Sequence, residues 1–339
     1  MQTDTEQNTD DRITVIRPRP WQVVQRTDAG NCRVAVQVRC GLRKARIEAR
    51  LVLMSNASGA ATNWLRFEAT ADGELFEGTV PAAAGGWYSL EVRAVDDAGA
   101  AAETSVHHVG VGEVFITAGQ SNSSNYGCTP LRAEEDRVVA YDGGAWQPAV
   151  DPLPGARGEG GSPWCPFADR LVRHLDVPVA IAAVGYHGVK AAEWAPGGEA
   201  WPRLERVLKA LGPNGVRAVL WHQGEADNGA GTTGEDYYAA LAAAITASRE
   251  AAGYRVPWFV ARASFVPAKY EPPQERSAAV RGAQTRLCTD GLALPGPDTD
   301  DMTGPEYRCD DEIHMNANGL WTHGERWFRA VSVVLRGRQ

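Results

Sequence analysis

Apolar and polar residues alternate along the first third of the chain. Every second residue is apolar over residues 32–40, and the same alternation returns over residues 45–53 and 88–94. A period of two is typical of antiparallel strands that bury one face and expose the other. The pair Asp72-Gly73 lies between two such runs and predicts a hairpin turn. We therefore expect about seven short strands over residues 12–110, packed as an immunoglobulin-like β-sandwich.

After residue 112 the pattern changes to short, continuous apolar runs that alternate with helical periods. The runs, which we expect to be strands, cover residues 114–118, 138–141, 177–184, 218–221 and 258–261. Apolar residues three or four apart predict helices with buried stripes at Phe167, Leu171 and Leu175, at Leu204, Val207, Leu208 and Leu211, at Tyr238, Leu241 and Ile245, and at Trp327, Val331 and Leu335. This alternation predicts a mostly parallel sheet with helices on both faces, over residues 111–339. The polar segment 1–11 is expected to be a disordered tail.

The composition argues against several classes of partner. A net charge of -8 and an isoelectric point near 5.5 disfavour nucleic acid and anionic membranes, which select basic surfaces, and favour a neutral substrate. No apolar run approaches the roughly 20 residues that span a bilayer. The first residues carry no export signal, so we expect a cytoplasmic protein as the sequence stands, and a secreted or periplasmic one if a signal peptide precedes it. No pattern specifies an oligomeric state.

The six cysteines lack the close pairs that mark zinc or redox sites, so neither a metal site nor a cofactor is indicated. Cys32 and Cys40 share one predicted strand and lie too far apart to bond to each other. The other four are either buried free thiols or two disulfides that pin loops. The two pairs would be Cys128 with Cys165, and Cys288 with Cys309.

The run VFITAGQSN at residues 114–122 is the first place where chemistry is indicated. Residues 114–117 are β-branched or aromatic, as in a strand buried on both faces, and the run breaks at a glycine shortly before Ser121. Ligands of open α/β folds bind beyond the carboxyl ends of the strands, where this hydroxyl would lie. We therefore take Ser121 as the candidate nucleophile. The alternative is that Ser121 only caps a following helix.

Two further predicted strands end in glycine-rich or polar segments. Gly185 and Gly188 follow the run 177–184, and a glycine N–H there can serve an oxyanion or simply form a turn. The segment WHQGEAD at residues 221–227 follows the next run. The Gln223 amide can donate to a developing oxyanion, and Glu225 supplies a carboxylate. The alternative is a polar strand end with Trp221 packed in the core.

The segment DEIH at residues 311–314 precedes the last predicted helix, over residues 318–335. Asp311 and His314 lie three residues apart on a turn, so the carboxylate can fix the imidazole tautomer while the other ring nitrogen faces Ser121. We interpret the surrounding acidic residues as a solvated loop, with a calcium site as the alternative. These residues are Asp298, Asp300, Asp301, Asp310 and Glu312.

The sequence leaves the role of two tryptophans open. Trp164 and Trp194 either line a platform for a sugar ring or belong to the core.

Taken in order, these motifs resemble those of the SGNH hydrolases: GQSN at residues 119–122, the glycine stretch ending in EW at 193–194, WHQGEAD, and DEIH. They are most similar to the branch of sialate O-acetylesterases and acetylxylan esterases. The resemblance covers residues 111–334 or so. It implies a flavodoxin-like, three-layer α/β/α domain with a parallel sheet, preceded by a β-sandwich that also recurs in that branch.

The resemblance also implies roles for individual residues. Ser121 would be the nucleophile, His314 the base and Asp311 its orienting acid, with Glu225 as the competing acid. The oxyanion hole would be the Ser121 N–H, a glycine N–H and the Gln223 amide. The branch often has GGT before its EW, whereas this chain has His187, Gly188 and Val189, so Gly188 is the expected oxyanion glycine with Gly185 in reserve. Gln120 and Trp194 would support the site or bind substrate.

The implied reaction is removal of acetyl groups from acetylated sugars or polysaccharides through an acyl-enzyme, without a cofactor. Two alternatives stay open. One is an esterase for other small acyl esters on the same fold. The other is a non-catalytic carbohydrate-binding protein in which the β-sandwich binds the sugar.

Overall fold

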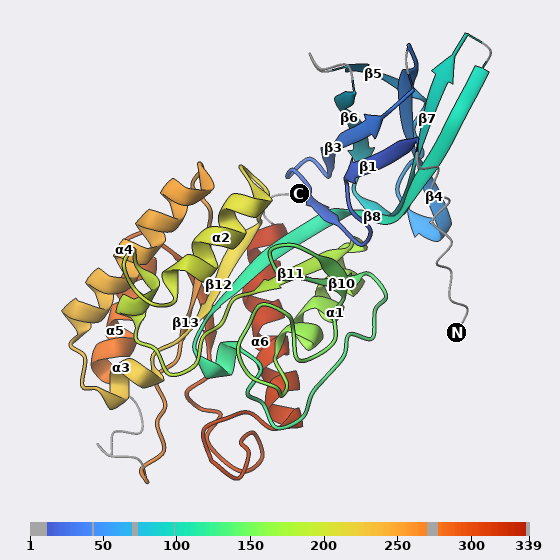
Figure 1. The fold of residues 1–339 in the computed structure, drawn as a ribbon. Helices are drawn as coiled ribbons and strands as arrows, with labels where there is room; N and C mark the ends of the chain where they lie inside the picture. The colour runs from blue at the N-terminus through green and yellow to red at the C-terminus, as the bar shows by residue number, and fades with distance from the viewer. Residues whose placement is uncertain (1–11, 43, 70–73, 98, 270–276, 337–339) are drawn as a thin grey trace. The chain divides into compact units, whose positions relative to one another are not determined.

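The structure is a computed structural model that describes residues 12–42, 44–69, 74–97, 99–269 and 277–336 (Figure 1). The expected tail and the expected turn at Asp72-Gly73 lie outside the described residues. The chain divides into two units. The first reaches Glu113 and includes Asp176–Pro178, and the second contains Val114–Leu175 and the chain from Val179 onward.

The alternating residues of the first unit form two antiparallel sheets that share β5. The sheet orders are β1-β3-β6-β5 and β5-β4-β7-β8, and β2 pairs in parallel with β8. Val36, Ile47 and Leu90 come from different strands and pack in one core between the sheets. Because each sheet turns one apolar face inward, the unit is a β-sandwich, as expected. Its strands are β1 (Ile13–Arg17), β2 (Val23–Gln25), β3 (Asn31–Cys40), β4 (Arg46–Ser58), β5 (Leu65–Ala69), β6 (Leu75–Ala83), β7 (Gly85–Asp96) and β8 (Gly99–Gly119).

The second unit is built on a sheet of order β10-β9-β11-β8-β12-β13-β14, to which β8 contributes its last residues. β9 pairs in parallel with β11, β12 with β8 and β13, and β13 with β14, whereas β10 runs antiparallel to β9. All five predicted runs are strands. The further strands of this sheet are β9 (Val138–Tyr141), β10 (Trp146–Pro148), β11 (Val179–Ala183), β12 (Ala218–His222), β13 (Trp258–Arg262) and β14 (Leu294–Asp298).

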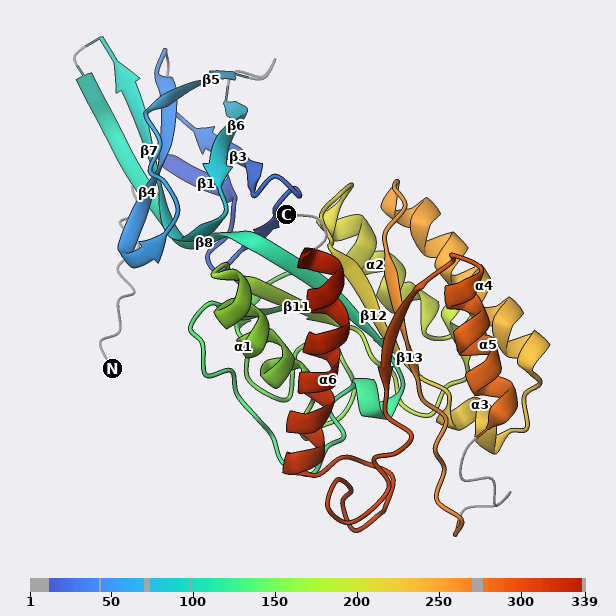
Figure 2. The ribbon, with the colours of Figure 1, turned by 180° about the vertical axis from the view of Figure 1, so that it is seen from behind.

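Helices cover both faces of this sheet and give three layers. Phe115 of β8 packs with Phe167 and Trp327 of α1 and α6 on one face, and these two helices lie side by side (Figure 2). Trp221 of β12 packs with α2, α4 and α5 on the other face. The helices are α1 (Trp164–Leu175), α2 (Trp201–Leu211), α3 (Glu225–Gly229), α4 (Gly234–Ala252), α5 (Ala278–Thr289) and α6 (Ala317–Arg336). None of the described helices is both long and apolar enough to cross a membrane.

Some details differ from the expectations. Tyr237, rather than Tyr238, is fully buried on α4, because residues 237, 241 and 245 are spaced by four and share one face. The pattern does not predict β14, whose sequence LPGPD carries two prolines. β14 pairs with β13 at the end of the described sheet, and an edge strand tolerates a missing N–H.

The order of the strands brings the predicted motifs together. β8 lies between β11 and β12, so the strand order reverses direction at β8. Open α/β sheets bind ligands at such a point, beyond the carboxyl ends of the strands. The N–H of Val184 donates to the Thr117 carbonyl, and the N–H of Gln120 donates to the His222 carbonyl. The carboxyl ends of β8, β11 and β12 therefore meet at one edge, and the GQSN, glycine and WHQGEAD segments follow them directly.

Candidate active site

Ser121 lies in a short 3-10 turn, Ser121–Ser123, directly beyond the end of β8. The strand ends at Gly119, which has a φ of +131°, and a Cβ there would lie 2.0 Å from the carbonyl oxygen of His222. Glycine at this position therefore allows β8 to approach β12 closely at the point where the strand ends and the turn begins. Only 3% of Ser121 is exposed.

The hydroxyl of Ser121 differs from those of the two serines that follow. Ser123 Oγ donates to the Ala118 carbonyl at 2.9 Å, and Ser124 Oγ also donates to main-chain oxygens. Among the described residues, Ser121 Oγ has no hydrogen-bond partner, and the turn begins at Gln120 without a side-chain cap. Ser121 is thus not the cap of this turn, and its hydroxyl is the one left for chemistry.

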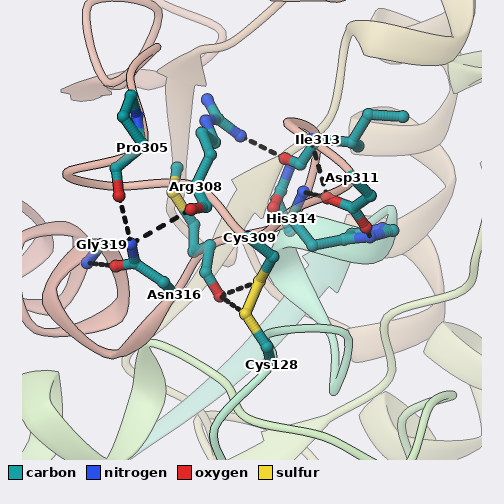
Figure 3. Close-up of a disulfide and its surroundings, with 11 residues drawn as sticks. Cys128, Pro305, Arg308, Cys309, Asp311, Ile313, His314, Asn316 and Gly319 are labelled. Carbon is teal, nitrogen blue, oxygen red and sulfur yellow. Dashed lines mark hydrogen bonds and ion pairs between the residues drawn. A yellow bond between two sulfur atoms is a disulfide. The ribbon is translucent and has the colours of Figure 1, made fainter.

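His314 and Asp311 form a close pair in the loop before α6 (Figure 3). Asp311 Oδ2 lies 2.5 Å from His314 Nδ1, and Asp311 Oδ1 accepts the N–H groups of Ile313 and His314, each at 2.9 Å. A carboxylate only accepts hydrogen bonds, so the proton of the neutral ring belongs on Nδ1. His314 Nε2 is buried without a partner in the described part of the chain. This nitrogen is therefore left as an acceptor.

The pKa of Asp311 reflects two opposing effects. Burial acts to raise this pKa, but the hydrogen bonds from the backbone and ring of His314 and from the Ile313 N–H outweigh it, so that the pKa lies below its ordinary value. Asp311 thus stays ionised at neutral pH, as an acid that stabilises an imidazolium must.

Asn122 connects three of the predicted segments, although its role is not evident from the sequence. Its Nδ2 donates to Glu225 Oε1 at 2.9 Å and to the Ile313 carbonyl at 3.2 Å. Gln120 makes a parallel connection, since its Oε1 accepts the Ala226 N–H at 3.0 Å. The residues on both sides of Ser121 therefore hold the WHQGEAD segment, and Asn122 also holds the loop of His314.

Glu225 bonds to Asn122 rather than to the histidine. Its Oε1 accepts the amide, and Oε2 is buried without a partner among the described residues. Of the two candidate acids, Asp311 is the one whose carboxylate contacts His314.

The two predicted oxyanion glycines have different surroundings. Gly188 is exposed, has a φ of +68°, and a Cβ there would meet nothing within 4 Å. Gly185 is buried, and a Cβ there would lie 2.9 Å from the Ser123 carbonyl oxygen. Gly185 therefore permits close packing beneath the Ser121 turn, whereas the segment around Gly188 is positioned by its flanking residues.

The Gln223 amide is engaged through its nitrogen. Gln223 Nε2 donates to Asp227 Oδ2 at 2.6 Å and to the Val189 carbonyl at 3.2 Å, while Oε1 is buried without a partner in the described residues. Its main-chain carbonyl accepts from Tyr237 Oη and Gln284 Nε2. One amide N–H is thus bound tightly to a carboxylate and the other loosely to the glycine segment. An oxyanion could use only this second N–H.

A disulfide joins the loops that carry the serine and the histidine. Cys128 bonds to Cys309, with 6.2 Å between the Cα atoms (Figure 3). Both proposed pairings are therefore wrong, and Cys165 and Cys288 are free. Cys309 lies two residues before Asp311, so the bond fixes the start of the DEIH turn.

Arg308 supports the same loop from inside and is a residue that the motifs do not reveal. It is 5% exposed, and its guanidinium donates to the main-chain oxygens of Met302 and Ile313. Burial lowers the pKa of Arg308, while Glu225, Asp300 and Asp311 act to raise it. The buried cation thereby balances carboxylates around the site.

Aromatic rings stand beside the histidine. The ring of Tyr126 stacks on His187, with centroids 4.6 Å apart, and on His314, with centroids 5.4 Å apart. Desolvation, and next the charge of His314, lower the pKa of His187. Trp164 and Trp194 are each 0% exposed and lie in the cores on either face of the sheet. The platform interpretation of these two tryptophans, including Trp194 as a substrate-binding residue, is therefore wrong.

The acidic residues near the site are mostly paired. Asp298 and Asp300 bind Arg281 at 2.8 and 2.7 Å, and Asp300 is only 2% exposed. The expectation of a solvated loop is thus wrong for Asp300, whose carboxylate also accepts the Ser264 N–H. Among the residues that the structure describes, no cluster of His, Cys, Asp and Glu is arranged to hold a metal ion.

Solved structures with a similar fold include esterases. A carbohydrate acetylesterase from Xanthomonas citri is 21% identical, with a TM-score of 0.61 over 94% of this chain and 74% of that chain. A protein from Arabidopsis thaliana is 17% identical, with a TM-score of 0.49 over 66% of this chain and 98% of that chain. A family 3 carbohydrate esterase from Clostridium thermocellum is 12% identical, with a TM-score of 0.44 over 66% of this chain and 98% of that chain.

Sequence comparison is consistent with this fold. No curated protein matches the chain at a significant level. The model of one family, described as carbohydrate esterase, sialic acid-specific acetylesterase, matches residues 111–332. This match includes every motif discussed above and most of the second unit. The chain belongs to that carbohydrate esterase family.

Proposed function

We propose that this protein removes acetyl groups from acetylated sugars or polysaccharides through an acetyl-enzyme formed on Ser121. The observation that carries the proposal is the pairing of Asp311 with His314 Nδ1, which leaves a buried Nε2 without a partner in the described part of the chain. The loop of His314 is bonded through the Ile313 carbonyl to Asn122, the neighbour of Ser121. A hydroxyl, a ring nitrogen that can take its proton and a carboxylate behind the ring are the parts that nucleophilic acyl transfer needs. Membership of a carbohydrate esterase family supports this reaction.

The first half of the reaction acylates the serine. His314 Nε2 takes the proton of Ser121 Oγ while that oxygen attacks the acetyl carbonyl carbon. Asp311 keeps the ring in the required tautomer and stabilises the imidazolium. The tetrahedral intermediate collapses when the bond to the sugar oxygen breaks and His314 returns the proton to that oxygen. The products of this half are the free sugar hydroxyl and the acetyl-enzyme.

The negative charge of the tetrahedral intermediate requires donors at the strand edge. We assign this task to the N–H of Ser121, the N–H of Gly188 and one N–H of Gln223. The Gln223 N–H that donates to Val189 O at 3.2 Å is the weaker of its two bonds, so it is the one that can be exchanged for the oxyanion.

The second half repeats the chemistry with water. His314 takes a proton from water, the water oxygen attacks the acetyl group, and Ser121 Oγ leaves with the proton from His314. Acetate is released, and the free serine is restored. Each step uses groups of this chain and water.

The test is acetate release from a panel of acetylated mono- and oligosaccharides, with p-nitrophenyl acetate and p-nitrophenyl butyrate as simple esters. The proposal expects acetate from at least one sugar at a kcat/KM above that for the simple esters, and none from Ser121→Ala. Activity on the simple esters alone would favour a general small-ester hydrolase. Sugar binding without release of acetate would favour the non-catalytic alternative.

A further inference from the structure

We infer that Asp227 is a positioning residue of this reaction, because it holds both the Gln223 amide and the Gly188 segment in the arrangement that serves the oxyanion. The inference rests on the proposed function. Asp227 lies in α3 and is 2% exposed. It is the last residue of the WHQGEAD segment, and the motif resemblance assigns no role to it. Its contacts join the two segments that would supply the oxyanion donors beyond Ser121 itself.

One carboxylate oxygen makes both connections. Asp227 Oδ2 accepts Gln223 Nε2 at 2.6 Å and the main-chain N–H of Ala191 at 2.9 Å. Gln223 follows β12, whereas Ala191 lies three residues after Gly188 and follows β11. Because all three groups are buried, these bonds are shielded from water and are correspondingly strong.

The acceptor character of a carboxylate decides the orientation of the amide. The oxygen and nitrogen ends of a glutamine side chain have nearly the same shape, so packing alone distinguishes them poorly. Asp227 can only accept, and it therefore selects the nitrogen end of Gln223. Once one N–H points to Asp227, the planar amide aims the other N–H at the glycine segment, where it now meets Val189 O. The opposite orientation would direct Oε1 there and repel an oxyanion.

The Gly188 segment needs the second connection. A Cβ on Gly188 would contact nothing within 4 Å, so packing at that residue does not fix its N–H. The segment is held from its flank, through Ala191 to Asp227 and through Val189 to Gln223. Loss of Asp227 would loosen two of the three proposed donors together.

The test uses Asp227→Asn in the full-length chain, with kcat and KM measured for one acetyl ester. We expect kcat to fall by about 10- to 100-fold, the usual effect of losing a group that orients a catalytic one, with KM changed less than threefold or so. The affinity for a tetrahedral phosphonate analogue should fall by a similar factor, because that analogue also uses the oxyanion donors. If Asp227→Asn does not fold, Asp227→Glu is measured in its place, because it keeps the charge but displaces the carboxylate from Gln223 and Ala191.

Asp169→Asn is the matched control. Asp169 is likewise buried, and it likewise holds a loop, by accepting the N–H groups of Glu134 and Glu135 at 3.0 to 3.1 Å. Asp169→Asn should therefore lower the melting temperature, because it weakens the hold on a loop, and leave kcat unchanged, because that loop lies outside the site. The double variant Gln223→Ala/Asp227→Asn should lose less than the product of the single losses, because Asp227 acts partly through Gln223.

The outcomes separate the two proposals. If Ser121→Ala is inactive but Asp227→Asn keeps the wild-type kcat, or if its loss multiplies fully with that of Gln223→Ala, the inference about Asp227 is wrong and the proposed function stands. If Ser121→Ala keeps its activity, the proposed function itself is wrong.

Discussion

At the residue scale, two carboxylates compete for the role of the acid, and their contacts differ. Asp311 lies 2.5 Å from His314 Nδ1, whereas Glu225 accepts the Asn122 amide at 2.9 Å. The spacing in the sequence favours Asp311, because a residue three positions before the histidine reaches its ring without help from another loop. The contact of Glu225 with Asn122 cannot be foreseen in this way, since it joins residues that are 103 positions apart.

We predict that Asp311→Asn lowers kcat by up to about 10⁴, because the variant no longer stabilises the imidazolium or the required tautomer. Glu225→Gln should cost less, since an amide oxygen can still accept from Asn122. Both variants are assayed with one ester at saturating concentration after circular dichroism shows that they are folded. A larger loss from Glu225→Gln would transfer the role of the acid to Glu225.

Asp151 gives a prediction about pH and stability. Asp151 is 6% exposed, and burial raises the pKa of its carboxyl to about 6 although hydrogen bonds from Ser162 and the Leu131 N–H lower it. An unfolded aspartate titrates near pH 3.9. Between about pH 4 and 6 the folded state therefore holds a proton that the unfolded state has lost. The free energy of unfolding that depends on this group falls as pH rises through that window and is constant above it.

Asp151→Asn removes this titration. The difference in melting temperature, variant minus wild type, should therefore increase from pH 4 to pH 7. A destabilisation by the amide that does not depend on pH would shift this difference equally at every pH. Thermal melts across that range measure the difference. A difference that stays flat with pH would mean that Asp151 is not the group that titrates there.

At the scale of elements, the sequence predicts best where one local pattern decides the outcome. The buried runs that became β9, β12 and β13 are found within one residue, because continuous apolar strands between helices have few alternatives. β14 escapes prediction because its prolines are acceptable only at a sheet edge, which is a property of the assembled sheet. The site follows the same rule. Motif positions can be predicted, but the contacts of Asp227 and Arg308 depend on the assembled loops.

The disulfide illustrates the same limit and supplies a further prediction. The two cysteines are separated by 181 residues, so spacing cannot identify the pair. Cys309→Ser should lower the free energy of unfolding by about 2–4 kcal/mol, because the unfolded chain regains a long loop. It should also lower kcat more than it changes KM, since the bond holds the turn of Asp311 and His314. Denaturant unfolding and steady-state kinetics provide the measurements.

Two controls accompany this prediction. Treatment of the wild type with a dithiol reductant should reproduce the effect and leave Cys309→Ser unchanged. Cys288→Ser removes a free thiol and should alter neither property. Equal effects from Cys288→Ser and Cys309→Ser would show that the bond between Cys128 and Cys309 has no special role.

At the scale of the whole molecule, the proposed site and the sandwich belong to different units. Ser121, Gln223, Asp311 and His314 all lie in the second unit, and the sandwich has a core of its own. We therefore predict that residues 112–339, expressed alone, fold and hydrolyse a small acetyl ester with a kcat near that of the full chain. A folded fragment without this activity would mean that the sandwich helps to build the site.

The kcat of Ser121→Ala for acetate release decides whether Ser121 is the nucleophile. We expect a folded protein whose kcat is lower by about 10⁴ or more, because the nucleophile is lost. Ser123→Ala and Ser124→Ala should lose far less, since their hydroxyls donate to main-chain carbonyls. A Ser121→Ala protein that keeps its activity, while Ser123→Ala or Ser124→Ala is inactive, would contradict the assignment of the nucleophile.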